Sequence, residues 1–158
     1  MIKLVHSRAL AVAGGVCLTV AAWSSVGVCA ERKDPLFGIT NDPAKIQTQL
    51  QLAVPELEKG LRLLQSSSDP DQLNLALDAL FDSYRYLRAA QESSDQINNH
   101  KRFPDPMVQL RNQRVWRVRS HLIKCRASFA PNSEGIAMCT EEASAALREL
   151  RIILQVFP

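Results

Sequence analysis

The feature that most constrains the fold is an Asp-Pro pair in front of three of the four long apolar runs in this chain of 158 residues. These pairs are Asp42-Pro43, Asp69-Pro70 and Asp105-Pro106. An aspartate carboxylate accepts hydrogen bonds from the free amides at a helix start, and proline fits the first helical position. Each pair therefore predicts the start of a helix, and the break "FAPNSEG" separates the third helix from a fourth.

Apolar residues recur in these runs at spacings of three and four, which is the period of an amphipathic helix. The first stripe is Ile46, Leu50, Ala53, Leu57, Leu61 and Leu64, the second is Leu73, Leu77, Leu80, Tyr84 and Leu87 with Gln91 at its end, and the fourth is Ile136, Cys139, Ala143, Ala146, Leu150, Leu154 and Phe157. Connections of moderate length favour antiparallel neighbours. The sequence predicts an all-α domain over residues 42–158, an up-down four-helix bundle.

Two details refine this prediction. Pro55 interrupts the first helix, and we expect it to kink that helix near Gln51 and Leu52 or to split it in two. The second helix is expected to end near Ser93, where a polar connection begins. On that helix, Tyr84 is expected in the core and Tyr86 on the surface.

The first thirty residues have the pattern of a secretory signal peptide. Lys3 and Arg8 give a positive start, residues 9–23 are uncharged and apolar, and small residues stand at the cleavage positions before Glu31. We expect cleavage after Ala30, and an uncleaved membrane anchor is the alternative. Residues 31–41 would form an extended lead-in. The protein is then exported, periplasmic or secreted, with no stable membrane insertion after cleavage.

Two cysteines, Cys125 and Cys139, lie outside the predicted signal peptide, which holds Cys17 and Cys29. An even number of cysteines in an oxidising compartment favours a disulfide. In an antiparallel hairpin the end of the third helix faces the start of the fourth, so the bond would join them. A redox-active or metal-binding pair is the alternative, but the spacing matches no such motif and no metal site is predicted.

The third helix, about Pro106 to Ala127, carries three strips of side chains when it is wound at about 100° per residue. The apolar seam is Val108, Val115, Val118, Leu122 and Cys125, and a basic strip consists of Arg114, Arg117, His121 and Lys124. A third strip holds Trp116, Arg119 and Ile123.

Arg111 falls inside the apolar seam of this helix, where the spacing calls for an apolar residue. A buried guanidinium needs a partner or a route to the surface along its stem. We expect either exposure at the end of the bundle or a pair with Asp78 or Asp82 of the second helix.

Positive charge is concentrated in the third helix and the residues just before it. Residues 100–126 hold eight basic groups and one acidic group, a net charge of +7, whereas residues 31–99 have a net charge of −4 and residues 127–158 of −2. Without the predicted signal peptide the whole chain has a net charge of only +1, so its overall charge does not predict nucleic-acid binding.

This asymmetry has two explanations. The basic groups of the third helix either bind an acidic protein partner or are neutralised within the bundle by Asp78, Asp82, Glu142 and Glu149. Arg and Trp are the side chains over-represented at binding hot spots. The candidate binding residues are Arg111, Arg114, Trp116, Arg117, Arg119 and His121.

The chain contains no sequence motif for catalysis or for a cofactor. Only His100 and His121 follow the predicted signal peptide, and no glycine-rich phosphate loop is present. We therefore predict a non-enzymatic exported protein without a cofactor that binds another protein, as an inhibitor, immunity-type protein, assembly factor or chaperone does. The alternative is a carrier that holds a small ligand or cofactor in the bundle interior.

Overall fold

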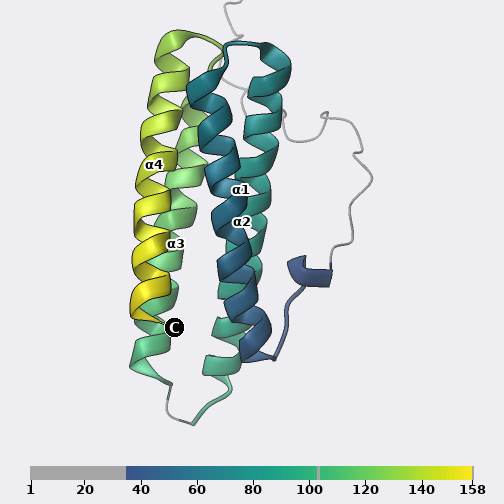
Figure 1. Cartoon of the computed structure of the whole chain (residues 1–158). Coiled ribbons are helices and arrows are strands. Elements are labelled where there is room, and N and C mark those ends of the chain that lie inside the picture. Colours follow the sequence, from purple (N-terminus) through teal and green to yellow (C-terminus); the bar gives the residue numbers. More distant parts are fainter. Residues whose placement is uncertain (1–34, 103, 158) are drawn as a thin grey trace, which may run out of the picture. The chain divides into compact units, whose positions relative to one another are not determined.

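The computed structural model describes residues 35–102 and 104–157, so the predicted signal peptide lies outside the described residues. The described part contains a 3-10 helix, η2 (Pro35–Phe37), and four long helices: α1 (Pro43–Ser66), α2 (Pro70–Asn99), α3 (Pro106–Ser128) and α4 (Ser133–Val156). These residues form no strand. The α1–α2 and α3–α4 connections lie at one end of the bundle and the α2–α3 connection lies at the other (Figure 1). The all-α fold and the alternating helix directions are as predicted.

The predicted helix starts are confirmed in atomic detail. The carboxylates of Asp42, Asp69 and Asp105 each accept a hydrogen bond from the backbone amide two residues further on, at 2.9 to 3.3 Å. Asn132 begins α4 in a similar way, because its Oδ1 accepts from the Gly135 amide at 2.8 Å. Local capping chemistry and apolar period therefore give the same helix boundaries.

Helix α1 is one continuous element through Pro55, so the alternative of two separate helices is wrong. The proline is solvent-exposed, which keeps its ring out of the packed face. A kink near Gln51 and Leu52 stays a prediction.

Most of the core comes from the predicted apolar seams, but Val108 of the α3 seam is only partly buried and lies outside the core. In α3, Val115, Val118, Leu122 and Cys125 are each at most 5 % exposed. The predicted roles of the two tyrosines of α2 are wrong: Tyr86 is 9 % exposed and belongs to the core, whereas Tyr84 is only partly buried against it. The reason lies before α1, because the ring of Phe37 covers Tyr86 with their centroids 4.4 Å apart.

Helix α2 ends at Asn99 and not near Ser93, since the polar residues of its last two turns have partners inside the fold. Ser93 is fully buried and its Oγ accepts a hydrogen bond from the Thr40 amide at 2.9 Å. Asn98 is 3 % exposed and its Oδ1 accepts from the Asp105 amide at 2.8 Å. The serines and asparagines that were predicted to form a connecting loop therefore belong to the packed end of α2.

The segment before α1, expected to be extended, includes the 3-10 helix and lies against α1 and α2. Gln49 is 1 % exposed, and its Nε2 donates to the carbonyls of Leu36 at 2.7 Å and Gly38 at 2.9 Å. The Arg85 guanidinium lies 4.0 Å from the centre of the Phe37 ring. Side-chain hydrogen bonds and ring packing therefore hold this segment on the bundle.

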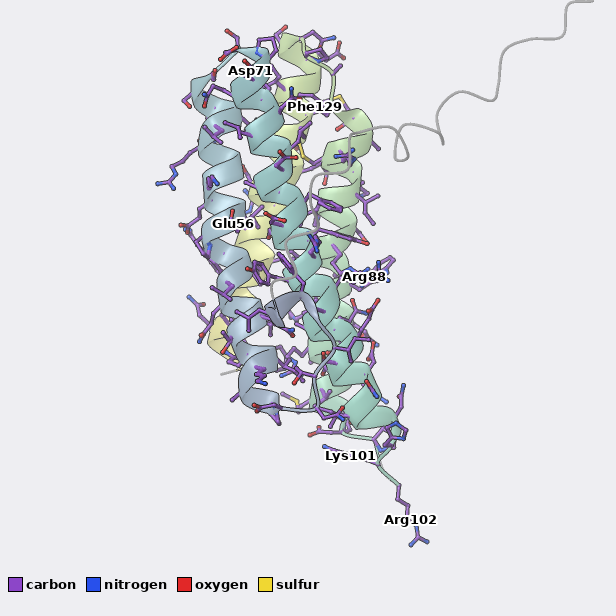
Figure 2. All side chains as sticks on the ribbon, turned by 90° about the vertical axis from the view of Figure 1, so that its right-hand side faces the viewer. Glu56, Asp71, Arg88, Lys101, Arg102 and Phe129 are labelled. Atoms are coloured by element: carbon purple, nitrogen blue, oxygen red, sulfur yellow. A yellow bond between two sulfur atoms is a disulfide. The ribbon has the colours of Figure 1, made fainter. Side chains whose placement is uncertain are left out.

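Figure 2 shows the side chains over the described residues, with Lys101 at the α2–α3 end of the bundle and Phe129 near the opposite end. No helix among these residues has the length and apolar character that crossing a membrane requires.

Candidate functional site

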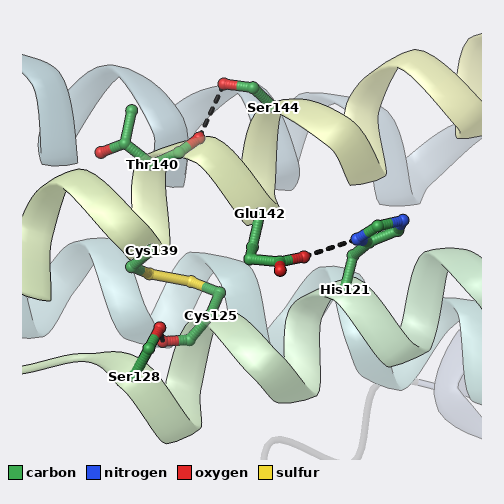
Figure 3. Close-up of a disulfide and its surroundings, with 7 residues drawn as sticks. All are labelled: His121, Cys125, Ser128, Cys139, Thr140, Glu142 and Ser144. Atoms are coloured by element: carbon green, nitrogen blue, oxygen red, sulfur yellow. Dashed lines mark hydrogen bonds and ion pairs between the residues drawn. A yellow bond between two sulfur atoms is a disulfide. The ribbon is translucent and has the colours of Figure 1, made fainter.

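Two members of the basic strip face α4 and pair with its glutamates. Arg114 Nη1 lies 3.1 Å from Glu149 Oε1, and His121 Nδ1 lies 2.5 Å from Glu142 Oε2 (Figure 3 shows the second pair). All four side chains are between 21 % and 32 % exposed. For these two basic residues, the pairs are those expected if the charge is neutralised within the bundle.

The two cysteines form a third contact between α3 and α4, beside the two ion pairs. The Sγ atoms of Cys125 and Cys139 lie at disulfide-bonding distance, one turn beyond the His121–Glu142 pair (Figure 3). Both residues are at most 1 % exposed. The predicted Cys125–Cys139 pair is confirmed, and it fixes the register that also aligns Arg114 and His121 with their glutamates.

Arg119 turns to the opposite side, towards α2. Its Nη1 donates to Gln91 Oε1 at 2.8 Å and its Nη2 donates to Tyr84 Oη at 3.0 Å. The guanidinium carbon also lies 5.0 Å from the centre of the Tyr84 ring, within the range of a cation–π contact. Arg119 is therefore engaged between α3 and α2, by neutral partners and not by a carboxylate.

Arg111 also faces α2, and neither predicted carboxylate partner is correct. Its Nη2 donates to Ser94 Oγ at 2.6 Å. Asp82 lies beside Arg85 at 3.8 Å and Asp78 is exposed. Ser94 and Asp82 are twelve residues apart on α2, about 18 Å along the axis, so the antiparallel register places Asp82 beyond reach.

Burial lowers the pKa of Arg111 below the ordinary arginine value, because desolvation disfavours the charged form, and the nearby Asp105 carboxylate opposes this effect. The group is half-buried within two turns of the α3 start. Arg111 thus serves the contact between α2 and α3 at the end of the bundle.

The basic strip and the third strip of α3 each keep two exposed side chains, and these four form one surface. We call it the outer face of α3 and define it by Trp116, Arg117, Ile123 and Lys124. Trp116 and Ile123 are 59 % and 55 % exposed, and the two cations are also exposed. Each apolar residue precedes a cation, and the two pairs are seven residues, or about 10 Å, apart on the helix. Among the described residues, neither Arg117 nor Lys124 has an ion-pair partner.

A groove of about 530 Å³ adjoins this surface, between the last turns of α2 and the first turns of α3. Its α2 side is lined by Gln91, Asp95, Asn98 and Asn99. Its α3 side is lined by Gln109, Asn112, Gln113, Trp116 and Arg117. Six of these nine residues are amides, three from each helix, and the apolar period of the sequence did not predict that they would meet in one groove.

The six predicted binding residues are therefore not one surface. Trp116 and Arg117 share the outer face and the groove rim, Arg114 and His121 face α4, and Arg119 and Arg111 face α2. The described residues contain no group of three or more His, Cys, Asp or Glu side chains able to hold a metal ion. Comparisons of the chain with protein-family models, with curated proteins and with solved structures find no match.

Proposed function

We propose that this protein is an exported, non-enzymatic helical bundle that binds an acidic protein through the outer face of α3. One observation carries the proposal: Trp116 and Ile123 are each more than half exposed, next to two cations that have no ion-pair partner among the described residues. An exposed tryptophan beside arginine is the combination enriched at interface hot spots.

The partner's charge follows from what the bundle does and does not neutralise. Arg114 and His121 have glutamate partners in α4, so they contribute little to an external field. Arg117 and Lys124 have none among the described residues and lie in a segment with net charge +7. Complementary charge accelerates association and fixes orientation, so the favoured partner presents carboxylates to these two cations.

Export rests on the signal-peptide pattern of residues 1–30 and on the cysteine pair. A disulfide-bonding geometry is compatible with an oxidising compartment outside the cytoplasm. In that setting a small binding bundle suits the role of an inhibitor, immunity-type protein, assembly factor or chaperone. Fold alone does not choose among these roles.

Site-specific photo-cross-linking in cells that naturally produce the chain tests this proposal. Ser120 lies between the two cation–apolar pairs of the outer face, so a photoreactive amino acid at this position should capture the partner. The same amino acid at Arg62, an exposed position of α1, is the matched control. We expect an acidic protein cross-linked only from position 120, and equal capture of the same proteins from both positions would contradict the proposal.

A further inference from the structure

We propose that the groove between α2 and α3 binds a neutral, polyhydroxylated ligand, namely a short stretch of glycan. The proposal goes beyond protein binding by the outer face, because it concerns the amide-lined surface beside that face. It rests on the chemistry of the lining, on the fixed positions of two buried amides and on the exposed ring of Trp116.

The lining combines donors and acceptors with almost no net charge. Four of its six amide side chains are at least partly exposed, and each of these presents a carbonyl oxygen and an NH₂ group that can pair with ligand hydroxyls: Gln91, Asn99, Gln109 and Gln113. Asp95 and Arg117 contribute one charge of each sign. Vicinal hydroxyls of a sugar ring match this alternation, whereas a strongly charged ligand would find one opposing charge for each favourable one.

Two of the amides are held in place before any ligand binds. Asn112 is 5 % exposed, and its Nδ2 donates to Asp95 Oδ1 at 2.6 Å. Asn98 is 3 % exposed, and its Oδ1 accepts from the Asp105 amide at 2.8 Å. Fixed polar groups lower the ordering cost of binding.

Asn112 also has an unmet hydrogen-bonding capacity. Its buried Oδ1 has no partner among the described residues. A buried polar atom without a partner costs about 1–3 kcal/mol in general, and this oxygen is also closed off from a ligand in the described groove. Asp95, which holds the Asn112 amide, forms no ion pair with a described basic group. Asp95 lines the groove, so its carboxylate can accept hydrogen bonds from ligand hydroxyls.

Trp116 completes the match to a sugar. Its side chain is 59 % exposed at the groove rim, and the C–H face of a sugar ring packs on such an aromatic surface. A peptide ligand would need pockets for apolar side chains, and Trp116 is the only apolar residue of the lining.

The test uses the full chain with Trp23→Phe, so that Trp116 is the only tryptophan. The chain is screened on an array of neutral oligosaccharides, and each hit is then titrated while the Trp116 emission is followed. A deca-glutamate peptide is titrated in parallel as the acidic-protein probe. We expect saturable binding of at least one neutral oligosaccharide.

Variants locate the binding. We expect Gln113→Ala and Gln109→Ala, both exposed, to lower the glycan affinity at least about threefold each, as the loss of hydrogen bonds predicts. Trp116→Ala is followed by calorimetry and should abolish glycan binding. Gln51→Ala, an exposed amide of α1, is the matched control and should leave the affinity unchanged.

Three results would overturn the proposal: no neutral oligosaccharide bound at millimolar concentration, glycan binding that survives the exposed-amide variants, or binding of deca-glutamate alone. The last result would favour the outer face as the only binding surface. Lys124→Glu separates the two proposals, because it should weaken deca-glutamate binding and leave glycan affinity unchanged.

Discussion

The Arg111 guanidinium donates a 2.6 Å hydrogen bond to the Ser94 hydroxyl, and this contact places a cation at a seam position of α3. Burial of the group lowers its pKa, so the charged form is destabilised relative to water. One hydroxyl replaces only part of the lost hydration. The α2–α3 contact at this end of the bundle is therefore specific but costly.

We predict that Arg111→Leu leaves the protein as stable or more stable, by up to about 1 kcal/mol, because it replaces a half-buried charge by a seam-filling side chain. Ser94→Ala should instead lower the free energy of unfolding by about 1–3 kcal/mol, since it leaves the Arg111 charge without its partner. Urea unfolding of both single variants and the double variant measures these terms. A greater loss from Arg111→Leu than from Ser94→Ala would refute this account.

The lowered pKa of Arg111 also determines how its contribution to stability changes with pH. A lowered pKa means that the folded state disfavours charged arginine, so this penalty is present below the folded-state pKa and is relieved only as pH rises through it. Arginine remains charged throughout the usual working range. We therefore expect the stability difference between the native chain and Arg111→Leu to stay constant from about pH 5 to pH 9. A difference that disappears within that range would implicate another group.

Removing the disulfide with Cys125→Ala and Cys139→Ala should lower the free energy of unfolding by about 3 kcal/mol, since the bond closes a loop of about 15 residues. The mass of the protein isolated from its native cells should also fall short of the reduced mass by two hydrogens. The reduced native chain serves as the control and should match the double variant. Two free thiols in the protein isolated from its native cells would show that the pair is not bonded there.

Gly60 marks a close approach of α1 to α2. A Cβ at this position would lie 2.7 Å from Leu80 Cδ2 and 2.9 Å from the Ala76 carbonyl oxygen. Gly60→Ala should therefore destabilise the protein by about 1–3 kcal/mol, although alanine is the better helix former. Gln51→Ala on the exposed side of α1 is the control. Stabilisation by Gly60→Ala, measured by urea unfolding, would mean that the two helices separate readily.

Much of the fold follows from local chemistry. Asp42, Asp69 and Asp105 cap their helices as predicted, and the α3 seam from Val115 to Cys125 is buried as its spacing requires. These features depend on residues within a few positions of one another. Helix boundaries are predictable from such local patterns because capping and packing favour the same boundaries.

The errors occur where a residue's environment is set by distant chain. Tyr86 is buried because Phe37 covers it, and Ser93 is buried inside the fold, where its hydroxyl accepts a hydrogen bond from the Thr40 amide. Arg111 finds Ser94 and not Asp82 because of the α2–α3 register. The outer face of α3 likewise depends on distant residues. It consists of the side chains that stay exposed after Arg114 pairs with α4 and Arg119 bonds to α2. No single-helix pattern contains this information.

The segment before α1 offers a further test. Ser93→Ala removes the acceptor of the Thr40 amide, and we expect hydrogen exchange at Thr40 to accelerate at least about tenfold while the amides of Leu50 and Leu57 stay protected. Gln96→Ala, at an exposed position of α2, is the control. Unchanged exchange at Thr40 would mean that other contacts hold this segment.

Charge reversal on the outer face of α3 shows whether this surface binds an acidic protein. The dissociation constant of the partner cross-linked from position 120 is measured for Arg117→Glu/Lys124→Glu and for Arg62→Glu/Arg148→Glu, which makes the same change in net charge at exposed positions of α1 and α4. We predict affinity at least about tenfold weaker for the first variant only, with a smaller dependence on salt. Equal affinities for the two variants, with both folded, would contradict the claim.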